Sequence, residues 1–197
     1  MVEIKKTGRW TIEATPHHLF LSLEKLSPDS TYAKVNPPIR TESERKNLWR
    51  YWKDIDVIGS DHAPHSKTDK SVSFDSAPSG IPGVETMIPL LMAQVAKGVI
   101  PLTDVVQKTS VAPSQILGIL PPGYEPGMRA DFSLYDREIE KIDSDRLSSK
   151  AGWTPFEGMD AIFPLMVLMG GEIAYDQGEF TRRSPVWLKG RGYNEGV

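Results

Sequence analysis

The sequence of 197 residues contains no cysteine. Disulfides, thiol nucleophiles and thiolate metal ligands are therefore excluded, and any metal site must be built from His, Asp or Glu side chains. Histidine is also scarce, with four in the chain. The lack of cysteine fits a reducing compartment, and we expect a cytoplasmic protein.

No apolar run approaches the roughly 20 residues that a membrane helix needs, so no membrane partner is expected. The segment from Met1 to Trp10 is basic and polar, and we do not expect a secretory signal there. The 23 Lys and Arg residues nearly balance the 26 Asp and Glu residues, for a net charge of −3. No basic patch indicates nucleic-acid binding, and the length allows one domain or slightly more.

The N-terminal part of the chain follows the pattern of an α/β protein. A β-prone run from Trp10 to Thr15 ends at two histidines, and Thr41 with Glu44 forms the pattern of a helix capping box. The helix from Thr41 is expected to reach about Lys53, with Leu48, Trp49 and Trp52 on its inner face. The next run, 55–60, is apolar on both faces, as in a strand of a buried parallel sheet.

Helices are predicted next, and then strands. Apolar spacing predicts a helix over 84–97 that ends at Gly98. Thr103 is the predicted cap of a second helix, and Pro113 opens a third. From about residue 119, alternating strands over 130–136, 166–170 and 172–175 predict a small β unit. We therefore expect two parts, an α/β part over 1–118 and a β-rich part over 119–197.

The stretch DVIGSDHAPH, residues 56–65, passes abruptly from an apolar strand to polar residues. Asp61 follows the strand directly, and a buried carboxylate must be protonated, hydrogen-bonded or bound to a metal. His62 and His65 come next, with Pro64 restricting the chain between them. Taken alone, a strand-end aspartate is more often a turn former or a helix cap.

Three other positions could bind a ligand, each with a plainer alternative. Asn36, before two prolines, offers an amide suited to a ureide or amide, or else makes a local turn bond. Gly80 permits close approach of backbone to a substrate, or else forms a plain turn. His17 and His18 suggest a metal site, but neighbours on a strand point to opposite faces. One core and one surface histidine are therefore expected.

The segment 66–83 is polar and rich in Ser, Pro and Gly. It is longer than a plain connection in a compact domain, which indicates a loop with a role of its own. Its charged residues Lys67, Asp69 and Lys70 are expected on a solvated loop surface.

Five segments together resemble the dihydroorotases of the amidohydrolase superfamily. They are EATPHHLFLS (13–22), KVNPPIRTESER (34–45), SDHAPHSKTDK (60–70), APSGIPGVETMIPLLM (77–92) and WTPFEGM (153–159). They follow the order and spacing of that family and span nearly the whole chain. Hydantoinases and allantoinases share the fold, but NPPIR together with DHAPH favours dihydroorotase.

The resemblance implies a (β/α)8 TIM-type barrel, of which this chain would hold the last two strands with their helices, followed by a small C-terminal β unit. It also implies a two-zinc site and the reversible cyclisation of N-carbamoyl-L-aspartate to L-dihydroorotate in pyrimidine biosynthesis. Asp61 matches the last metal-binding carboxylate of the family, which also transfers the proton. Asn36, His65 and Gly80 match substrate-binding positions, His65 toward the substrate carboxylate and Gly80 through its backbone.

The sequence departs from the family in one respect. The other metal ligands of the family, a His-x-His pair, a carboxylated lysine or aspartate and two single histidines, would precede the segment at 13–22. We therefore expect the chain to be inactive alone and to contact a complementary N-terminal fragment or a second copy. The family also suggests aspartate transcarbamoylase as a partner. The alternatives are a non-catalytic assembly module and a hydantoinase- or allantoinase-type enzyme.

Overall fold

The computed structural model describes residues 3, 7–8, 10–27 and 30–191, so most of the segment 1–10 lies outside the described residues. The strands are β1 (Glu13–Ala14), β2 (Val57–Ile58), β3 (Phe132–Leu134), β4 (Glu140–Lys141), β5 (Asp160–Ala161), β6 (Met166–Met169), β7 (Glu172–Asp176) and β8 (Glu179–Phe180). The α-helices are α2 (Pro16–Phe20), α3 (Glu42–Arg50), α4 (Lys67–Lys70), α5 (Val84–Ala96), α6 (Leu102–Val106) and α7 (Ala112–Leu117). Shorter helical segments are Leu23–Lys25, Thr31–Ala33, Trp52–Asp54, Gln107–Val111 and Ser144–Arg146.

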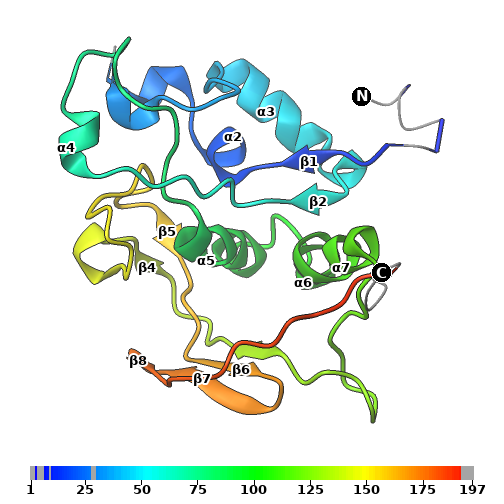
Figure 1. Cartoon of the computed structure of the whole chain (residues 1–197). Helices are drawn as coiled ribbons and strands as arrows, with labels where there is room; N and C mark the ends of the chain where they lie inside the picture. The colour runs from blue at the N-terminus through cyan, green and yellow to red at the C-terminus, as the bar shows by residue number, and fades with distance from the viewer. Residues whose placement is uncertain (1–2, 4–6, 9, 28–29, 192–197) are drawn as a thin grey trace, which may run out of the picture.

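Strands β1 and β2 pair in parallel, with Glu13 opposite Val57 and Ala14 opposite Ile58. Helices α2 and α3 lie on one side of this pair and α5, α6 and α7 on the other (Figure 1). Strand β2 is therefore covered on both faces, as the apolar run 55–60 predicts. The core cluster around the pair contains Ala14, Leu19, Trp52, Ile55, Ile58, Leu91, Ile100 and Val105.

The helix boundaries follow local chemistry at most positions. The Thr41 hydroxyl and the Glu44 carboxylate form the predicted capping box of α3, although the α-helix ends at Arg50. Helix α5 ends just before Gly98, whose positive φ of 69° suits glycine. The predicted cap at Thr103 is wrong, because α6 begins at Leu102 after an extended Pro101. Proline has no N–H group to satisfy, so a helix can begin directly after it.

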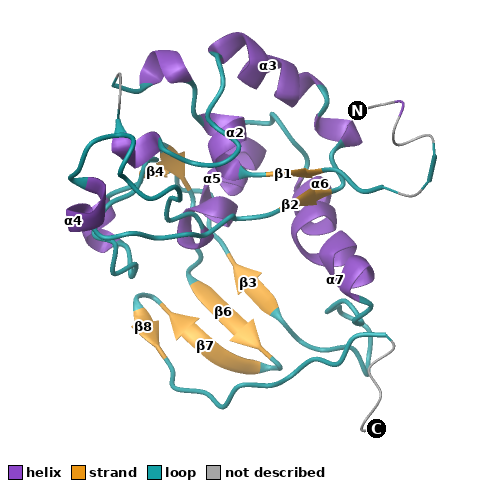
Figure 2. Cartoon of the chain, turned by 45° about the horizontal axis from the view of Figure 1, so that its top comes forward, coloured by secondary structure: helices purple, strands orange, loops and turns teal. Residues whose placement is uncertain are grey.

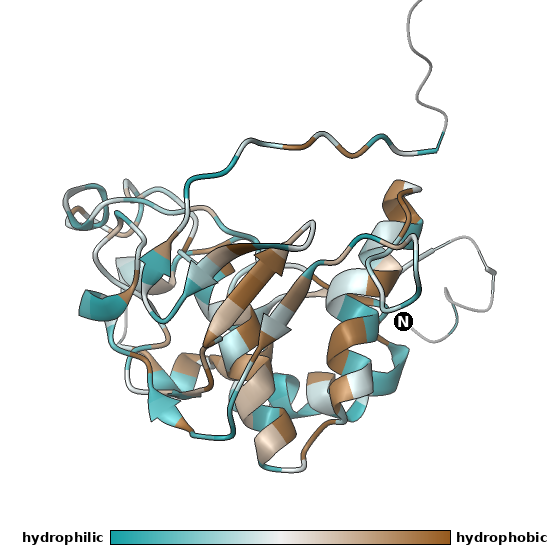
Figure 3. Ribbon diagram, turned by 90° about the horizontal axis from the view of Figure 1, so that it is seen from below, coloured by the Kyte–Doolittle hydropathy of each residue, from teal (hydrophilic) through white to brown (hydrophobic). Residues whose placement is uncertain are grey.

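The C-terminal residues form an antiparallel sheet with the strand order β3-β6-β7-β8 (Figure 2). Tight turns connect β6 to β7 at Gly170-Gly171 and β7 to β8 at Gln177-Gly178, and all four turn residues have positive φ. Viewed from below, apolar residues concentrate on the strands and the helices behind them (Figure 3). The strands predicted over 130–136, 166–170 and 172–175 are thus present as β3, β6 and β7.

A second core cluster joins segments that lie far apart in the sequence. Its buried members are Leu21, Val35, Ile39, Ile81, Leu90, Ile142, Ala151, Trp153, Phe156 and Ala161. Strands β4 and β5 pair with each other, and the chain between them supplies Ile142, Ala151, Trp153 and Phe156 to the cluster. The cluster therefore draws side chains from both sides of residue 118, and the division of the chain there stays a prediction.

Candidate functional site

Asp61 lies just beyond the carboxyl end of β2. The last bond of the strand pair runs from the Gly59 N–H group to the Ala14 carbonyl oxygen. Asp61 then adopts a positive φ of 45°, a conformation that few residues other than glycine, asparagine and aspartate adopt readily. Its side chain is 44% exposed, and its Oδ2 atom lies 3.8 Å from Nε2 of His17. The carboxylate is therefore accessible and faces an imidazole.

His17 and His18 lie in the first turn of α2, so the prediction that they follow each other along a strand is wrong. Pro16 has the restricted φ of a helix start, so the chain enters a helix here and does not continue as a strand. The ring centroids are 4.3 Å apart, and each ring has a nitrogen 2.8 Å from the Thr15 hydroxyl oxygen. His17 is buried as expected, whereas His18 is half-buried and not on the surface.

Burial governs the charge of His17. Its side chain is 1% exposed, and burial, followed by the charge of His18, lowers its pKa to about 3. His17 is therefore neutral at physiological pH. Its Nδ1 atom has no hydrogen-bond partner among the described residues.

Asn36 and His65 meet at one residue of the loop 66–83. The Asn36 side-chain amide donates to Oγ of Ser79 over 3.1 Å. Nε2 of His65 lies 3.1 Å from the backbone carbonyl oxygen of Ser79. The amide of Asn36 thus reaches across 43 residues and does not make the local turn bond of the plainer alternative.

Gly80 sits where a side chain would not fit. Its φ is +135°, and its N–H group donates to the Lys34 carbonyl oxygen over 2.9 Å. A Cβ atom there would lie 2.5 Å from the Ala63 carbonyl oxygen and 3.2 Å from Nε2 of His65. Only glycine allows this approach of the two backbone segments.

These contacts connect the predicted site residues into one group at the carboxyl ends of β1 and β2. His18 completes the connection, since its Nε2 atom lies 3.1 Å from the carbonyl oxygen of Pro37, next to Asn36. The group, hereafter the strand-end cluster, consists of Asp61, His17, Thr15, His18, Pro37, Asn36, Ser79, Gly80 and His65. All four residues that the sequence singles out for chemistry belong to it.

His62 has a different role from its neighbours. Its Nδ1 atom accepts the backbone N–H groups of Gly83 and Val84, at 3.1 and 3.3 Å, at the start of α5. The ring therefore caps a helix and needs no ligand. The spacing of His62 and His65 alone does not distinguish these two roles.

Lys70 is the clearest departure from the sequence expectation, which placed it on a solvated surface. Its side chain is 1% exposed, and Nζ donates to the carbonyl oxygens of Pro78 and Thr31 over 2.8 and 3.1 Å. The ammonium also lies 5.7 Å from the ring centroid of Trp153. Burial, and then the charge of Lys34, lowers its pKa. The long side chain folds inward and fixes the loop directly before Ser79.

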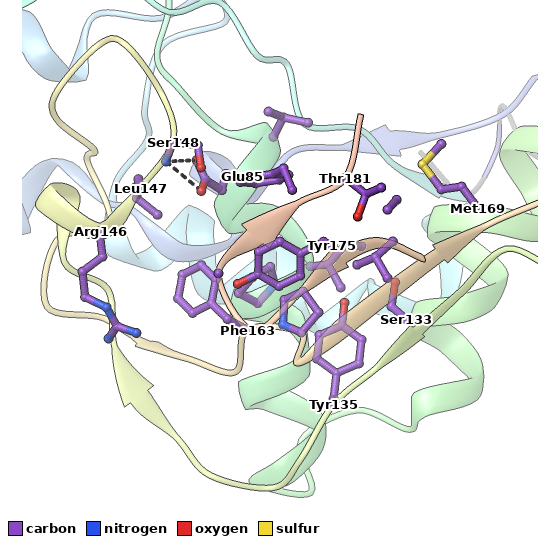
Figure 4. A pocket seen from close by; sticks show the side chains of 18 of the residues that line it. Glu85, Ser133, Tyr135, Arg146, Leu147, Ser148, Phe163, Met169, Tyr175 and Thr181 are labelled. Atoms are coloured by element: carbon purple, nitrogen blue, oxygen red, sulfur yellow. Dashed lines mark hydrogen bonds between the residues drawn. The ribbon is translucent and has the colours of Figure 1, made fainter. Parts of the chain in front are cut away.

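A cavity of about 590 Å³ lies elsewhere, between α5 and the C-terminal sheet (Figure 4). Its wall includes Tyr135, Arg146, Phe163 and Tyr175, and Glu85 accepts the N–H group of Ser148 at its rim. No member of the strand-end cluster lines it. The cavity is thus separate from the candidate site.

The family resemblance implies zinc, so the available ligands matter. In the described ranges, no three His, Asp or Glu side chains gather in a way that could hold a metal ion. Catalytic zinc takes about three protein ligands, so these residues alone do not fit a zinc site. Over the same ranges, no helix is both long and apolar enough to span a bilayer.

Known sequences similar to this chain are dihydroorotases. No protein-family model matches the chain. The dihydroorotase of Methanosarcina acetivorans is 44% identical over 176 residues, which cover 86% of this chain and 38% of that enzyme. The dihydroorotase of Thermoplasma volcanium is 45% identical over 177 residues, covering 88% and 42%. The chain thus spans about two fifths of the length of the curated relatives it matches.

Solved structures of the same fold are also similar. The L-hydantoinase of Arthrobacter aurescens superposes with a TM-score of 0.85 at 27% identity, covering 91% of this chain and 42% of that enzyme. The dihydropyrimidinase of Brevibacillus agri gives a TM-score of 0.82 at 26% identity, with the same coverage. The fold is therefore that of part of a hydantoinase-like enzyme.

Proposed function

We propose that this chain, a relative of the dihydroorotases that corresponds to their C-terminal portion, supplies one side of an active site. The substrate of that site is a cyclic amide. The reaction is the reversible hydrolysis of L-dihydroorotate to N-carbamoyl-L-aspartate. The chain holds the proton-transfer carboxylate and the substrate-binding groups, and residues outside this portion complete the site.

The strand-end cluster is the observation that carries this proposal. Its contacts run without a break from Asp61 to His65 and include Asn36 and Gly80. In α/β folds, groups at the carboxyl ends of parallel strands are the ones that face a substrate. Four residues chosen by motif resemblance would have no reason to share one cluster if the motif served packing alone.

The chemistry follows from the groups in the cluster. In hydrolysis, Asp61 accepts a proton from water as the water oxygen bonds to the ring carbonyl carbon. The ring C–N bond then breaks, and the same proton passes from Asp61 to the leaving nitrogen. The half-exposed position of Asp61 suits this shuttle, because both the water and the leaving nitrogen can reach the carboxylate.

The remaining groups bind the substrate. His65 is placed to contact the substrate carboxylate, and the amide of Asn36 is suited to the ureide. Both side chains already bond to Ser79, so substrate would share or replace those bonds. The backbone at Gly80 approaches the ring, since no Cβ blocks it.

The described residues form only part of a barrel. Within the described residues, β1 pairs with β2 alone, and a parallel pair of two-residue strands leaves backbone groups available for further pairing. We place β1 and β2 as the last two of eight barrel strands, with the other strands outside the described residues. Asp61 would contribute one zinc ligand, and the others would lie on those strands. A complementary fragment or a second copy of this chain is the proposed partner at the strand edge. The expected setting is the cytoplasm, with aspartate transcarbamoylase as a further partner.

A hydantoinase-type activity is the second candidate, because the similar solved structures include an L-hydantoinase and a dihydropyrimidinase. Hydantoin and dihydrouracil lack the carboxylate of dihydroorotate, so a role of His65 in carboxylate binding predicts a preference for dihydroorotate. A non-catalytic assembly module is the third candidate. It would bind a partner and show no turnover of any cyclic amide.

A replacement experiment tests the proposal. This chain is put in place of the matching region of the Methanosarcina acetivorans dihydroorotase, and hydrolysis of dihydroorotate, hydantoin and dihydrouracil is measured. We expect turnover with dihydroorotate as the best substrate and a loss of roughly 100-fold or more in Asp61→Asn. Asparagine tolerates the positive φ, and Asp145→Asn, at an exposed position far along the chain, is the matched control. A folded hybrid without activity on any of the three would contradict an enzymatic role.

A further inference from the structure

One hydroxyl group links the two neighbouring histidines, and the first of them, His17, lies next to Asp61. The Thr15 Oγ1 atom lies 2.8 Å from Nε2 of His17 and 2.8 Å from Nδ1 of His18. A hydroxyl has one proton, so it can donate to one of these nitrogens while it accepts from the other. The direction of the two bonds therefore fixes which nitrogen of His17 carries hydrogen.

The carbonyl oxygen of Pro37 decides that direction. It can only accept, and Nε2 of His18 lies 3.1 Å from it, so Nε2 of His18 carries the proton. In a neutral imidazole the other nitrogen, Nδ1, is then an acceptor and takes the Thr15 hydroxyl proton. The Thr15 oxygen is left to accept, and the remaining donor is the Nε2–H group of His17.

Two independent observations select the same tautomer of His17. Oδ2 of Asp61 lies 3.8 Å from Nε2 of His17, and a carboxylate is attracted by an N–H group and repelled by a bare nitrogen lone pair. Nδ1 of His17 is buried without a partner among the described residues. Buried N–H groups without a partner are rarer than acceptors without one, so the bare nitrogen belongs at Nδ1.

We infer that His17 is a positioning residue for Asp61, held as the Nε2–H tautomer by Thr15, His18 and the Pro37 carbonyl group. The Nε2–H group donates to the Thr15 oxygen, and its positive edge also attracts the Asp61 carboxylate 3.8 Å away and so biases its orientation toward the ring. His17 touches neither the water nor the leaving nitrogen, and acts through Asp61. This catalytic consequence rests on the proposed function, whereas the tautomer itself does not.

The tautomers are read directly from the full chain labelled with ¹⁵N, in long-range ¹H–¹⁵N correlation spectra at about pH 8, where free imidazole is neutral. We expect hydrogen on Nε2 of both rings. Thr15→Val removes the hydroxyl at nearly constant shape, so the Nε2–H group of His17 loses its acceptor and its ¹⁵N and ¹H shifts should move, and Thr15→Ser should restore them. Hydrogen on Nδ1 of His17 in the unmodified chain, or His17 Nε2–H shifts unchanged in Thr15→Val, overturns the inference.

The positioning role is tested in the replacement enzyme described above. Thr15→Val should lower kcat by about 10-fold with KM nearly unchanged, the loss typical of groups that orient a catalytic carboxylate, and Thr15→Ser should recover it. Thr109→Val, which removes a hydroxyl bonded to the Val105 carbonyl oxygen, should leave kcat unchanged. An active enzyme in which Thr15→Val keeps full kcat refutes the positioning role. An inactive unmodified hybrid counts against the proposed function and leaves the tautomer measurement to decide the rest.

Discussion

The indole Nε1–H group of Trp153 donates to the backbone carbonyl oxygen of His65 over 2.8 Å, across 88 residues of sequence. Trp153 also stacks edge-on against Tyr32 and lies beneath the ammonium of Lys70. A residue of the C-terminal part thus holds the loop that carries His65 and Gly80. The candidate site depends on packing from a segment that contributes no group to it.

Replacing Trp153 with phenylalanine should separate this hydrogen bond from the packing around it. The His65 carbonyl group would lose its donor, and we expect a loss of about 1–2 kcal/mol in the free energy of unfolding. Chemical denaturation followed by circular dichroism measures it. Trp10→Phe, at an exposed tryptophan, is the control and should change stability little. Equal effects of the two substitutions would show that the bond contributes nothing.

Lys70→Met should loosen the loop 66–83. Methionine fills much of the same volume but removes the ammonium donor to the carbonyl oxygens of Thr31 and Pro78, at a cost of about 1–3 kcal/mol. The expected result is faster limited proteolysis within the loop. Lys67→Met, three residues away at an exposed position, should be cleaved at the original rate. Unchanged cleavage in Lys70→Met would mean that the ammonium does not hold the loop.

Gly80→Ala should be markedly destabilising, because the new Cβ atom would lie 2.5 Å from the Ala63 carbonyl oxygen. Gly178 provides the control, since its φ of +101° is also unfavourable for alanine but no atom lies within 4 Å of the added Cβ. Thermal unfolding should therefore show a larger loss for Gly80→Ala than for Gly178→Ala. The difference isolates steric overlap from backbone strain, which alone costs about 1–3 kcal/mol. A greater loss at Gly178 would refute the close approach at Gly80.

The Asp160 carboxylate should make stability depend on pH in acid. It bonds to Nζ of Lys141 and Lys97 at 2.5 and 2.6 Å, and these hydrogen bonds, that of Lys141 first, lower its pKa to about 2. The folded pKa lies below the unfolded value of about 3.9. The contribution is therefore fully present above about pH 4 and is lost as the pH falls toward 2.

Asp160→Asn removes that contribution, so the variant should be less stable than the parent at neutral pH and close to it near pH 2. Urea denaturation midpoints across this range measure the difference. Asp145→Asn should keep the slope of the parent protein. A constant difference between Asp160→Asn and the parent at all pH values would show that the two lysines do not lower this pKa.

Elements that depend on neighbouring residues could be predicted from the sequence. The capping box at Thr41 and Glu44 and the end of α5 before Gly98 are set within a few residues, and both are present. The apolar run 55–60 predicts a strand of a parallel sheet, and β2 within it pairs in parallel with β1. The family resemblance also placed four residues that share one cluster, although motif matching cannot establish their roles.

Features that depend on distant backbone atoms could not be predicted. Lys70 looks like a surface lysine, because the carbonyl oxygens that bind it come from Thr31 and Pro78, and Trp153 lies far away in the sequence. The strand prediction for His17 and His18 is wrong for a local reason, since Pro16 starts a helix directly after the β-prone run. The acceptor that orients His18 is a backbone carbonyl group, which leaves no signal in the sequence.

The core cluster that joins Leu21 to Ala161 also constrains how the protein is made. During synthesis the early apolar residues leave the ribosome long before Ile142, Trp153 and Phe156 exist to cover them. Closing such long loops is slow compared with forming local helices. The nascent chain therefore carries these apolar side chains uncovered until Ile142, Trp153 and Phe156 have emerged, and it should rely on chaperones over that interval.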